Sequence, residues 1–420
     1  MELVQLNVSN YKSLRRVSFE PGRLTVIAGP NGSGKSNLAD CIDFVSEVYR
    51  HGLQLAVASK GGYENIAHRK MRRTKSPVRV FIRARLNSAD IRLNARKAYR
   101  HIVVEHMFEF QARGSSIRAE YGVVAETLNV YDETPDERVL LLSLARKSDK
   151  LIVSNFISSK DRNADFGALE YFADNSQIIS STELITWTVG RFAPLIAAFG
   201  TAAGKMRVFQ IHPNISRDDG VPGPRPELTR SGGNLPAVID ELKMRHNRAW
   251  GEVLSLMRVV MPGLIDIDVE YTPSRRLGLF FNEAGVGRPW SIGEVSDGTV
   301  QTLALLVALF DPQPSLLLIE EIENSVHSWI VRLLIKSAIE VSKSKQVVLT
   351  THSAVVLNLV LPHQILIMSR TGGESALVAL AKLDPSFVSD WKKGKTSTFA
   401  FLDSGILPEA VPPQLELPLN

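Results

Sequence analysis

Gly29-Pro30-Asn31-Gly32-Ser33-Gly34-Lys35-Ser36 fits the pattern G-x-x-x-x-G-K-[ST], in which the amides of a glycine-rich loop and a helix N-terminus face anionic oxygens. The residues before it, Leu24 to Ala28, form a β-branched run that predicts a short strand. The apolar residues after it recur at three- and four-residue steps, which predicts a helix: Leu38, Cys41, Ile42, Val45 and Val48. Strand, loop and helix in this order favour a phosphate-binding loop over the alternative, a glycine-rich turn without a ligand.

Two side chains of the loop carry its expected chemistry. Lys35 would bridge the β- and γ-phosphates of a nucleotide, and Ser36 would hold Mg²⁺. Cys41 lies on the apolar stripe of the following helix, so we expect it in the core rather than as a nucleophile.

A second set of polar residues follows two apolar runs near the C-terminus. Residues 315–319 read as a strand buried on both faces, and Glu320 and Glu321 come directly after it. Glu320 could ligate magnesium through water, and Glu321 could orient or deprotonate an attacking water. Residues 346–350 predict another strand, followed by His352, which could sense a γ-phosphate; a satisfied core histidine is the alternative.

A possible helix N-terminus precedes the first of these strands. Ser296-Asp297-Gly298-Thr299 stands before the almost wholly apolar run from Val300 to Phe310. A serine and a glycine at this position make an N-terminus that can receive an anion, although an ordinary helix cap has the same sequence.

Composition restricts the class of protein. The 420 residues are 44% hydrophobic and 22% charged, with a formal net charge of +5. One cysteine excludes a disulfide scaffold and cysteine-ligated zinc. Met1-Glu2-Leu3-Val4 does not read as a signal peptide, and the longest apolar run is too short to cross a membrane. We therefore expect a cytoplasmic protein of two or three lobes without a membrane partner.

The set of motifs, in this order, resembles the ABC-type ATPase head of the RecF, SMC and OLD group, including its stand-alone predicted AAA-family ATPases. Residues 6–14 also resemble the group's first strand and its N-[FY]-[KR]-S-[LF] element, and residues 209–213 and 232–238 resemble further segments. The resemblance implies ATP and Mg²⁺ as cofactors, with Lys35, Glu321 and His352 as catalytic residues and Ser36 and Glu320 as metal ligands. It implies the following nucleotide-binding residues: Lys12, Ser13, Asn31, Gly32, Ser33, Gly34, Lys35, Ser36, Asn37, and Ser296 and Gly298 from a second head.

Three departures from the group's pattern matter. Glu320 stands where many relatives have Asp. The signature Ser-Asp-Gly-Thr differs from the Ser-Gly-Gly-Gln of transporters, which argues against a transport subunit. The glutamine that usually completes the magnesium coordination is not identifiable.

The expected fold is α/β, an ABC-type P-loop ATPase head with a mixed sheet. A β-meander subdomain and a helical lobe would be inserted between Walker A and the signature. We expect an N-terminal half of the ATPase lobe with Walker A and a basic β-subdomain (residues 1–138), a helical insertion lobe (139–260), a half with the signature, Walker B and switch histidine (261–380), and a tail (381–420).

In the insertion, alternating residues 78–86 predict a strand with one basic face, and residues 102–110 and 116–124 predict further strands. Residues 126–137 predict a loop, and residues 139–200 are expected to be mainly helical.

Charge is concentrated in residues 60–100, which contain 13 Lys and Arg against Glu64 and Asp90. Such a block suits a phosphate backbone, but a solvated sheet face or a surface for an acidic protein partner explains it equally well.

Only 68 residues follow His352, so we expect no C-terminal nuclease domain of the OLD type, and any nuclease would be a separate chain.

The preferred functional hypothesis is an ATP-hydrolysing molecular switch that forms a head-to-head homodimer, or a higher homo-oligomer, on ATP. It would act on DNA or control a partner effector or nuclease, in DNA repair or anti-phage defence. The alternative is a nucleotide-dependent scaffold or sensor that recruits a protein partner with little turnover.

Overall fold

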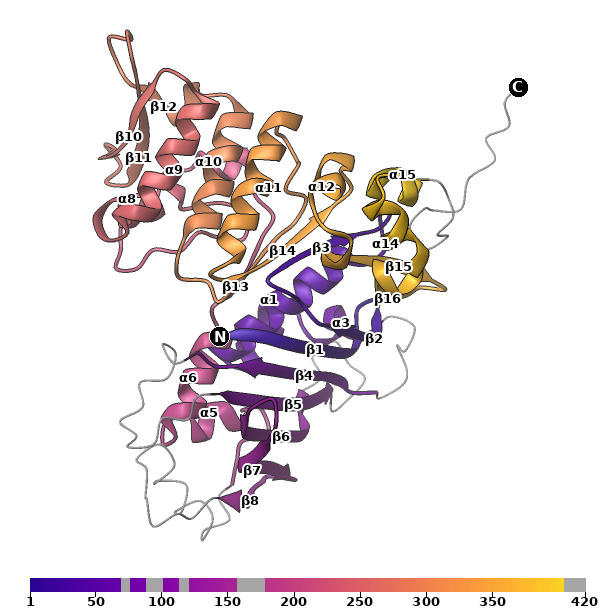
Figure 1. Ribbon diagram of the computed structural model, residues 1–420. Helices are drawn as coiled ribbons and strands as arrows, with labels where there is room; N and C mark the ends of the chain where they lie inside the picture. The colour runs from indigo at the N-terminus through magenta and orange to yellow at the C-terminus, as the bar shows by residue number, and fades with distance from the viewer. Residues whose placement is uncertain (69–75, 88–100, 113–120, 157–177, 404–420) are drawn as a thin grey trace. The chain divides into compact units, whose positions relative to one another are not determined.

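The structure is a computed structural model that describes residues 1–68, 76–87, 101–112, 121–156 and 178–403 (Figure 1). The chain divides into two compact units. Unit 1 comprises Met1–Gly22, Asn31–Met206 and Met368–Val378; unit 2 comprises Arg23–Pro30, Arg207–Ile367 and Ala379–Asn420. The boundary between Pro30 and Asn31 falls inside the phosphate loop.

Unit 1 is built on a seven-stranded sheet of order β2-β1-β4-β5-β6-β7-β8, in which the neighbouring strands pair antiparallel. Its strands are β1 (Glu2–Tyr11), β2 (Leu14–Phe19), β4 (Val78–Arg85), β5 (Ile102–Ala112), β6 (Tyr121–Glu133), β7 (Arg138–Lys147) and β8 (Lys150–Phe156). Strands β4 to β8 follow one another as a meander (Figure 1). In β4, Val78, Val80, Ile82 and Ala84 are buried and alternate with more exposed residues, which confirms the predicted strand.

The helix after the phosphate loop packs on this sheet. The helices of unit 1 are α1 (Lys35–His51), α2 (Leu53–Ser59), α3 (Tyr63–Ile66), α5 (Ile185–Val189) and α6 (Pro194–Ala203). The predicted apolar stripe of α1 is buried, and the Phe44 ring lies 5.6 Å from Tyr11 and 5.7 Å from Phe110 between ring centroids. Burial also raises the pKa of the Cys41 thiol, so this cysteine is a core residue, as predicted. Gly52, with φ 87°, ends the helix.

Two predictions for the insertion are wrong. The helix predicted over 139–200 is wrong for its first part: residues 138–156 are mostly strand, because the leucines of β7 pair across the sheet, with Leu142 opposite Val130 and Leu144 opposite Leu128. Cross-strand packing here overrides the helix propensity of leucine. Residues 157–177 lie outside the described residues, and helices α5 and α6 lie in the remainder. The predicted loop 126–137 is strand as far as Glu133, since its residues pair with both β5 and β7. Of the strand predicted over 116–124, residues 116–120 lie outside the described residues and 121–124 belong to β6.

The second main sheet has the order β16-β15-β3-β14-β13-β9. Its strands are β3 (Leu24–Ala28), β9 (Met206–Phe209), β13 (Leu316–Ile319), β14 (Gln346–Thr351), β15 (Ile365–Thr371) and β16 (Glu374–Ala379). In unit 2, β13, β14, β3 and the start of β15 are parallel neighbours. Every residue of β3, β13 and β14 is buried, as predicted for strands covered on both faces.

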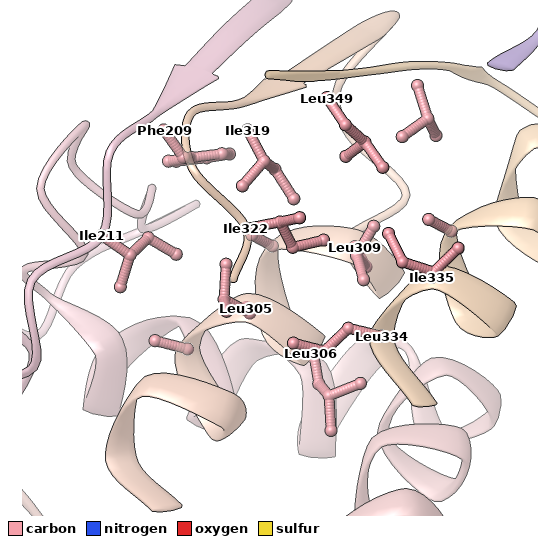
Figure 2. Close-up of a cluster of buried hydrophobic side chains, with 14 of the residues drawn as sticks. Phe209, Ile211, Leu305, Leu306, Leu309, Ile319, Ile322, Leu334, Ile335 and Leu349 are labelled. Carbon is pink, nitrogen blue, oxygen red and sulfur yellow. The ribbon is translucent and has the colours of Figure 1, made fainter. Parts of the chain in front are cut away.

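The helices of unit 2 lie around one hydrophobic core that they share with its strands. They are α7 (Pro213–Ser216), α8 (Leu235–Arg245), α9 (Asn247–Val260), α10 (Asp297–Phe310), α11 (Ser328–Ser342), α12 (Ala354–Leu359), α13 (Leu380–Leu383), α14 (Pro385–Lys392) and α15 (Thr398–Asp403), with 3₁₀ turns η2 (Ile292–Glu294) and η3 (Pro362–Gln364). Figure 2 shows Leu305 and Leu309 of α10 and Ile335 of α11 in one cluster with Ile319 and Leu349 of the strands. Helix α10 is buried on nearly all sides, which explains its almost wholly apolar sequence.

A smaller antiparallel sheet completes unit 2: β10 (Leu264–Tyr271), β11 (Leu277–Glu283) and β12 (Trp290–Ser291). Within the described ranges, no helix combines the length and the apolar character that crossing a membrane requires.

Candidate nucleotide-binding site

Gly32 and Gly34 are two of the glycines that shape the phosphate loop. Gly32 has φ 76° and Gly34 has φ 115°, a region that residues with a Cβ rarely adopt. A Cβ on Gly34 would lie 2.2 Å from Ser375 Oγ, whereas one on Gly32 would meet no atom within 4 Å. Gly34 is therefore fixed by close packing as well as by its backbone, and it directly precedes α1.

A chain of hydrogen bonds supports the loop from behind. Ser375 Oγ donates to the Ser33 carbonyl at 2.7 Å and lies 2.7 Å from Ser13 Oγ, which accepts from Asn37 Nδ2 at 2.7 Å. Because a hydroxyl has one hydrogen, Ser13 must donate to Ser375. The structure thus brings together Ser13, Asn37 and the loop, and gives Ser13 and Asn37 a positioning role. The sequence contained no signal for Ser375, since it lies more than 300 residues from its partners.

The exposed side of the loop is suited to phosphate oxygens. Asn31, Gly32 and Ser36 are exposed, while the Lys35 side chain is buried at its base. The Ser33 hydroxyl is buried and finds no hydrogen-bond partner among the residues that the structure describes. An orphaned hydroxyl, backbone amides and a helix N-terminus together form a set of donors that fits a polyphosphate.

Lys12 has a protein partner in the structure. Its ammonium lies 2.5 Å from Asp40 of α1, and Lys60 also contacts that carboxylate at 3.1 Å. Burial raises the pKa of Asp40, but the hydrogen bonds and charges of Lys12, Lys60 and Tyr11 outweigh it and lower the pKa to about 2. Lys12 therefore ties the start of the chain to α1, and its contact with a nucleotide stays a prediction.

In unit 2, the carboxyl ends of three parallel strands meet at one edge of the sheet. Thr351 lies opposite Ala28, and Leu349 lies opposite Ile319. Gly29 therefore leaves the sheet at the same edge as Glu320, Glu321 and His352. This is the edge at which open α/β sheets bind ligands.

The two carboxylates predicted for Walker B have different surroundings. Glu320 is buried, and its carboxylate accepts a hydrogen bond from Arg230 Nη2 at 2.7 Å. Glu321 is half-buried; its backbone has φ 48°, and its N–H donates to the carbonyl and hydroxyl oxygens of Thr350 at 3.1 Å each. Sequence reasoning missed Arg230, which lies 90 residues from Glu320.

His352 is exposed, and its backbone is held by a residue that sequence reasoning also missed. Glu323 Oε1 accepts hydrogen bonds from His352 N at 2.7 Å and from Thr351 Oγ1 at 2.8 Å. His352 is exposed, so it is not a core histidine, and its response to a γ-phosphate stays a prediction.

The signature residues begin α10. Ser296 is its N-cap and accepts from Thr299 N at 3.3 Å, while a Cβ on Gly298 would lie 3.3 Å from the Ser325 carbonyl. Arg217 holds the preceding loop by donating to the Ile292 and Val295 carbonyls and to Asp297 Oδ1. Ser296 thus serves as an ordinary cap and is exposed at the same time.

Few of the described side chains could hold Mg²⁺, and this ion commonly needs few protein ligands. Among the described residues, no group of three or more His, Cys, Asp or Glu could hold a metal ion. Mg²⁺ commonly takes one or two protein oxygens together with phosphate oxygens and waters. The exposed Ser36 hydroxyl of unit 1 and the buried Glu320 carboxylate of unit 2 are each oxygen donors of the kind that Mg²⁺ takes.

The basic face of β4 is matched by carboxylates. Its three arginines pair with acidic residues of the same sheet: Arg79 with Glu109, Arg83 with Glu133 and Glu105, and Arg85 with Glu2. Lys60 pairs with Asp40 and Asp43. The nine other basic residues of the 60–100 block lie outside the described residues.

Comparison with known proteins found similarity to an SMC protein and to SMC heads. A 55-residue stretch is 49% identical to the structural maintenance of chromosomes protein 1 of Saccharomyces cerevisiae; it covers 12% of this chain and 4% of that protein. An SMC head bound to the C-terminal winged-helix domain of ScpA is 16% identical with a TM-score of 0.47, over 91% of this chain and 100% of that chain. The SMC head of Thermotoga maritima is 15% identical with a TM-score of 0.40, over 90% and 99% of the two chains.

A family model matches residues 24–358, which include the phosphate loop, the signature, both Walker B carboxylates and His352. The family's description is "AAA domain, putative AbiEii toxin, Type IV TA system". The match extends over most of the chain, so this protein belongs to that family of AAA-domain ATPases.

Proposed function

We propose that the protein binds ATP at residues 29–36 and hydrolyses it, and that this cycle closes and opens a dimer of two heads. The loop geometry carries the proposal. Three glycines at positive φ, the buried Lys35 and the Ser33 hydroxyl, which has no hydrogen-bond partner among the described residues, form a cradle for phosphate oxygens. The common edge of β3, β13 and β14 supports the inclusion of Glu320, Glu321 and His352 in one chemistry.

Each residue then has a defined task. Lys35 neutralises the β- and γ-phosphates, and the amides of Gly32 to Ser36 orient them. Ser36 and Glu320 would hold Mg²⁺, which supplies positive charge to the phosphate oxygens when bound. Glu321 orients the attacking water and accepts its proton, as a half-buried carboxylate on a fixed backbone can.

The remaining predicted residues concern the loop's support and the second head. Ser13 and Asn37 hold the loop in its binding conformation, and Lys12 holds α1. Ser296 and Gly298 of one head would face the γ-phosphate on the other, since Ser296 is exposed at the start of α10. His352, also exposed, would respond to loss of that phosphate.

We also propose that the switch acts on a further macromolecule. The family's description names a toxin of a type IV toxin–antitoxin system, which supports a role in defence that involves a further macromolecule. A separate effector or nuclease fits this role. DNA binding rests on the basic residues at 69–75 and 92–100, because the described arginines of β4 already pair with carboxylates.

The test is to measure ATP binding and phosphate release for the wild type, Lys35→Ala and Glu321→Gln. We expect Lys35→Ala to lose binding, and Glu321→Gln to bind ATP without turnover, because an amide cannot accept the proton. Unchanged ATP affinity in Lys35→Ala would contradict the assignment of the loop. Wild-type protein that binds ATP without hydrolysing it would favour the nucleotide-dependent scaffold instead.

A further inference from the structure

Arg230 and Glu320 form an ion pair at the end of β13. Arg230 Nη2 lies 2.7 Å from Glu320 Oε1, and the side chains are 31% and 2% exposed, respectively. Glu320 is therefore a buried carboxylate whose charge is balanced from one side by a half-exposed guanidinium.

The backbone that presents Arg230 is tightly held. Gln210 N donates to the Arg230 carbonyl at 2.8 Å, and His212 N donates to the Ser231 carbonyl at 3.0 Å. The next turn needs a glycine, since Gly232 has φ 89° and a Cβ there would lie 2.5 Å from Ser216 Oγ. The backbone of Arg230 is thus fixed next to β9, and the freedom to leave Glu320 belongs to its side chain.

A buried carboxylate is costly without a counter-charge. A divalent cation and a guanidinium placed on one carboxylate repel each other, so the two compete for it. We infer that Arg230 balances the charge of Glu320 in the metal-free protein, gives way when Mg²⁺ binds there, and thereby sets how much Mg²⁺ the site needs. This inference rests on the proposed function, in which Glu320 is a metal ligand.

The competition predicts opposite effects on stability and on metal affinity. Arg230→Gln leaves Glu320 uncompensated, so the melting temperature of the metal-free protein should fall by several degrees. The same variant should reach half-maximal ATP binding at a Mg²⁺ concentration about tenfold lower, the effect of about 1.4 kcal/mol. A residue that merely supports the fold would lower stability without shifting the Mg²⁺ requirement downward.

The experiment is equilibrium dialysis at fixed ATP with Mg²⁺ as the titrant. Arg217→Gln is the matched control, because Arg217 lies in the same segment and pairs with Asp297 instead of Glu320; its Mg²⁺ midpoint should equal that of the wild type. Arg230→Lys, which keeps a charge at this position, should fall between wild type and Arg230→Gln. In a Glu320→Gln background, Arg230→Gln should restore the melting temperature relative to either single variant and should not shift the midpoint.

A midpoint for Arg230→Gln that is equal to or above that of the wild type overturns the inference. So does loss of ATP binding by this variant at saturating Mg²⁺, which would make Arg230 a phosphate ligand. Failure of the proposed function looks different: the wild type would then bind ATP no better than Lys35→Ala at any Mg²⁺ concentration.

Discussion

Glu323 accepts a hydrogen bond from the backbone N–H of His352 at 2.7 Å. The same carboxylate oxygen accepts a second hydrogen bond from the Thr351 hydroxyl, and the other oxygen, Oε2, is buried without a partner among the described residues. Glu323 thus links the segment after β13 to the end of β14, and it fixes the backbone from which the His352 ring projects.

We expect Glu323→Ala to lower kcat for ATP hydrolysis about tenfold, the effect of about 1.4 kcal/mol in the transition state, with little change in KM. Glu323→Gln should lose less, because the amide oxygen can still accept both hydrogen bonds. In a His352→Ala background, Glu323→Ala should lower kcat little further, since both changes remove the correctly placed His352 ring. Losses that multiply in the double variant would show that Glu323 acts independently of His352.

Gly34 and Gly32 should respond differently to a methyl group. Gly34→Ala combines a φ of 115° with a clash against Ser375, so it should lower the free energy of unfolding by about 1–3 kcal/mol and weaken ATP binding. Gly32→Ala meets open space and should cost less. Urea unfolding measures both, and Gly34→Ala with Ser375→Ala should recover part of the loss. Equal costs for the two single variants would contradict the packing argument.

Local patterns decide how much of this fold and site the sequence could predict. The loop, the helix after it and the buried strands at residues 24–28, 315–319 and 346–350 were predicted, because each has a local pattern of glycine spacing or continuous apolar character. Ser375, Arg230 and Glu323 were missed, because their roles depend on contacts between distant segments. The leucine run in β7 was misread for the same reason: its pairing with β6 decides its structure, and a single sequence does not display pairing.

Asp40 gives the protein a pH-dependent contribution to stability. Its pKa is lowered from 3.8 to about 2, so the ionised form stabilises the fold above pH 4, and this contribution disappears as the pH falls through 2. Asp40→Asn should therefore cost about 2 kcal/mol at pH 7, and its difference from wild type should shrink between pH 4 and pH 2. Lys12→Met should move this window to higher pH, since it removes one of the charges that lower the pKa. A pH-independent difference between Asp40→Asn and wild type, measured by denaturant unfolding, would contradict the ion-pair account.

Within the basic block of residues 60–100, the residues outside β4 should bind DNA. Replacing Arg69, Lys70, Arg72 and Arg73 with Gln should weaken DNA binding and reduce its salt dependence, because fewer counterions are released. Replacing Arg79, Arg83 and Arg85 with Gln should instead lower stability and leave the salt dependence unchanged, since these arginines face Glu109, Glu133 and Glu2. Fluorescence anisotropy over a series of salt concentrations separates the two sets. Absence of DNA binding by the wild type would favour a protein partner.

ATP should join two heads, and Glu321 should end this state by directing hydrolysis. Glu321→Gln should therefore accumulate as an ATP-dependent dimer, because the γ-phosphate stays between the loop of one head and Ser296 of the other. Ser296→Arg, whose exposed position tolerates bulk in the monomer, should prevent accumulation in the double variant without weakening ATP binding. The decisive measurement is the mass of Glu321→Gln by light scattering with and without ATP. A doubling of mass with ATP that Ser296→Arg abolishes is the predicted result, and a mass that ignores ATP while the variant hydrolyses it at the wild-type rate would contradict the account.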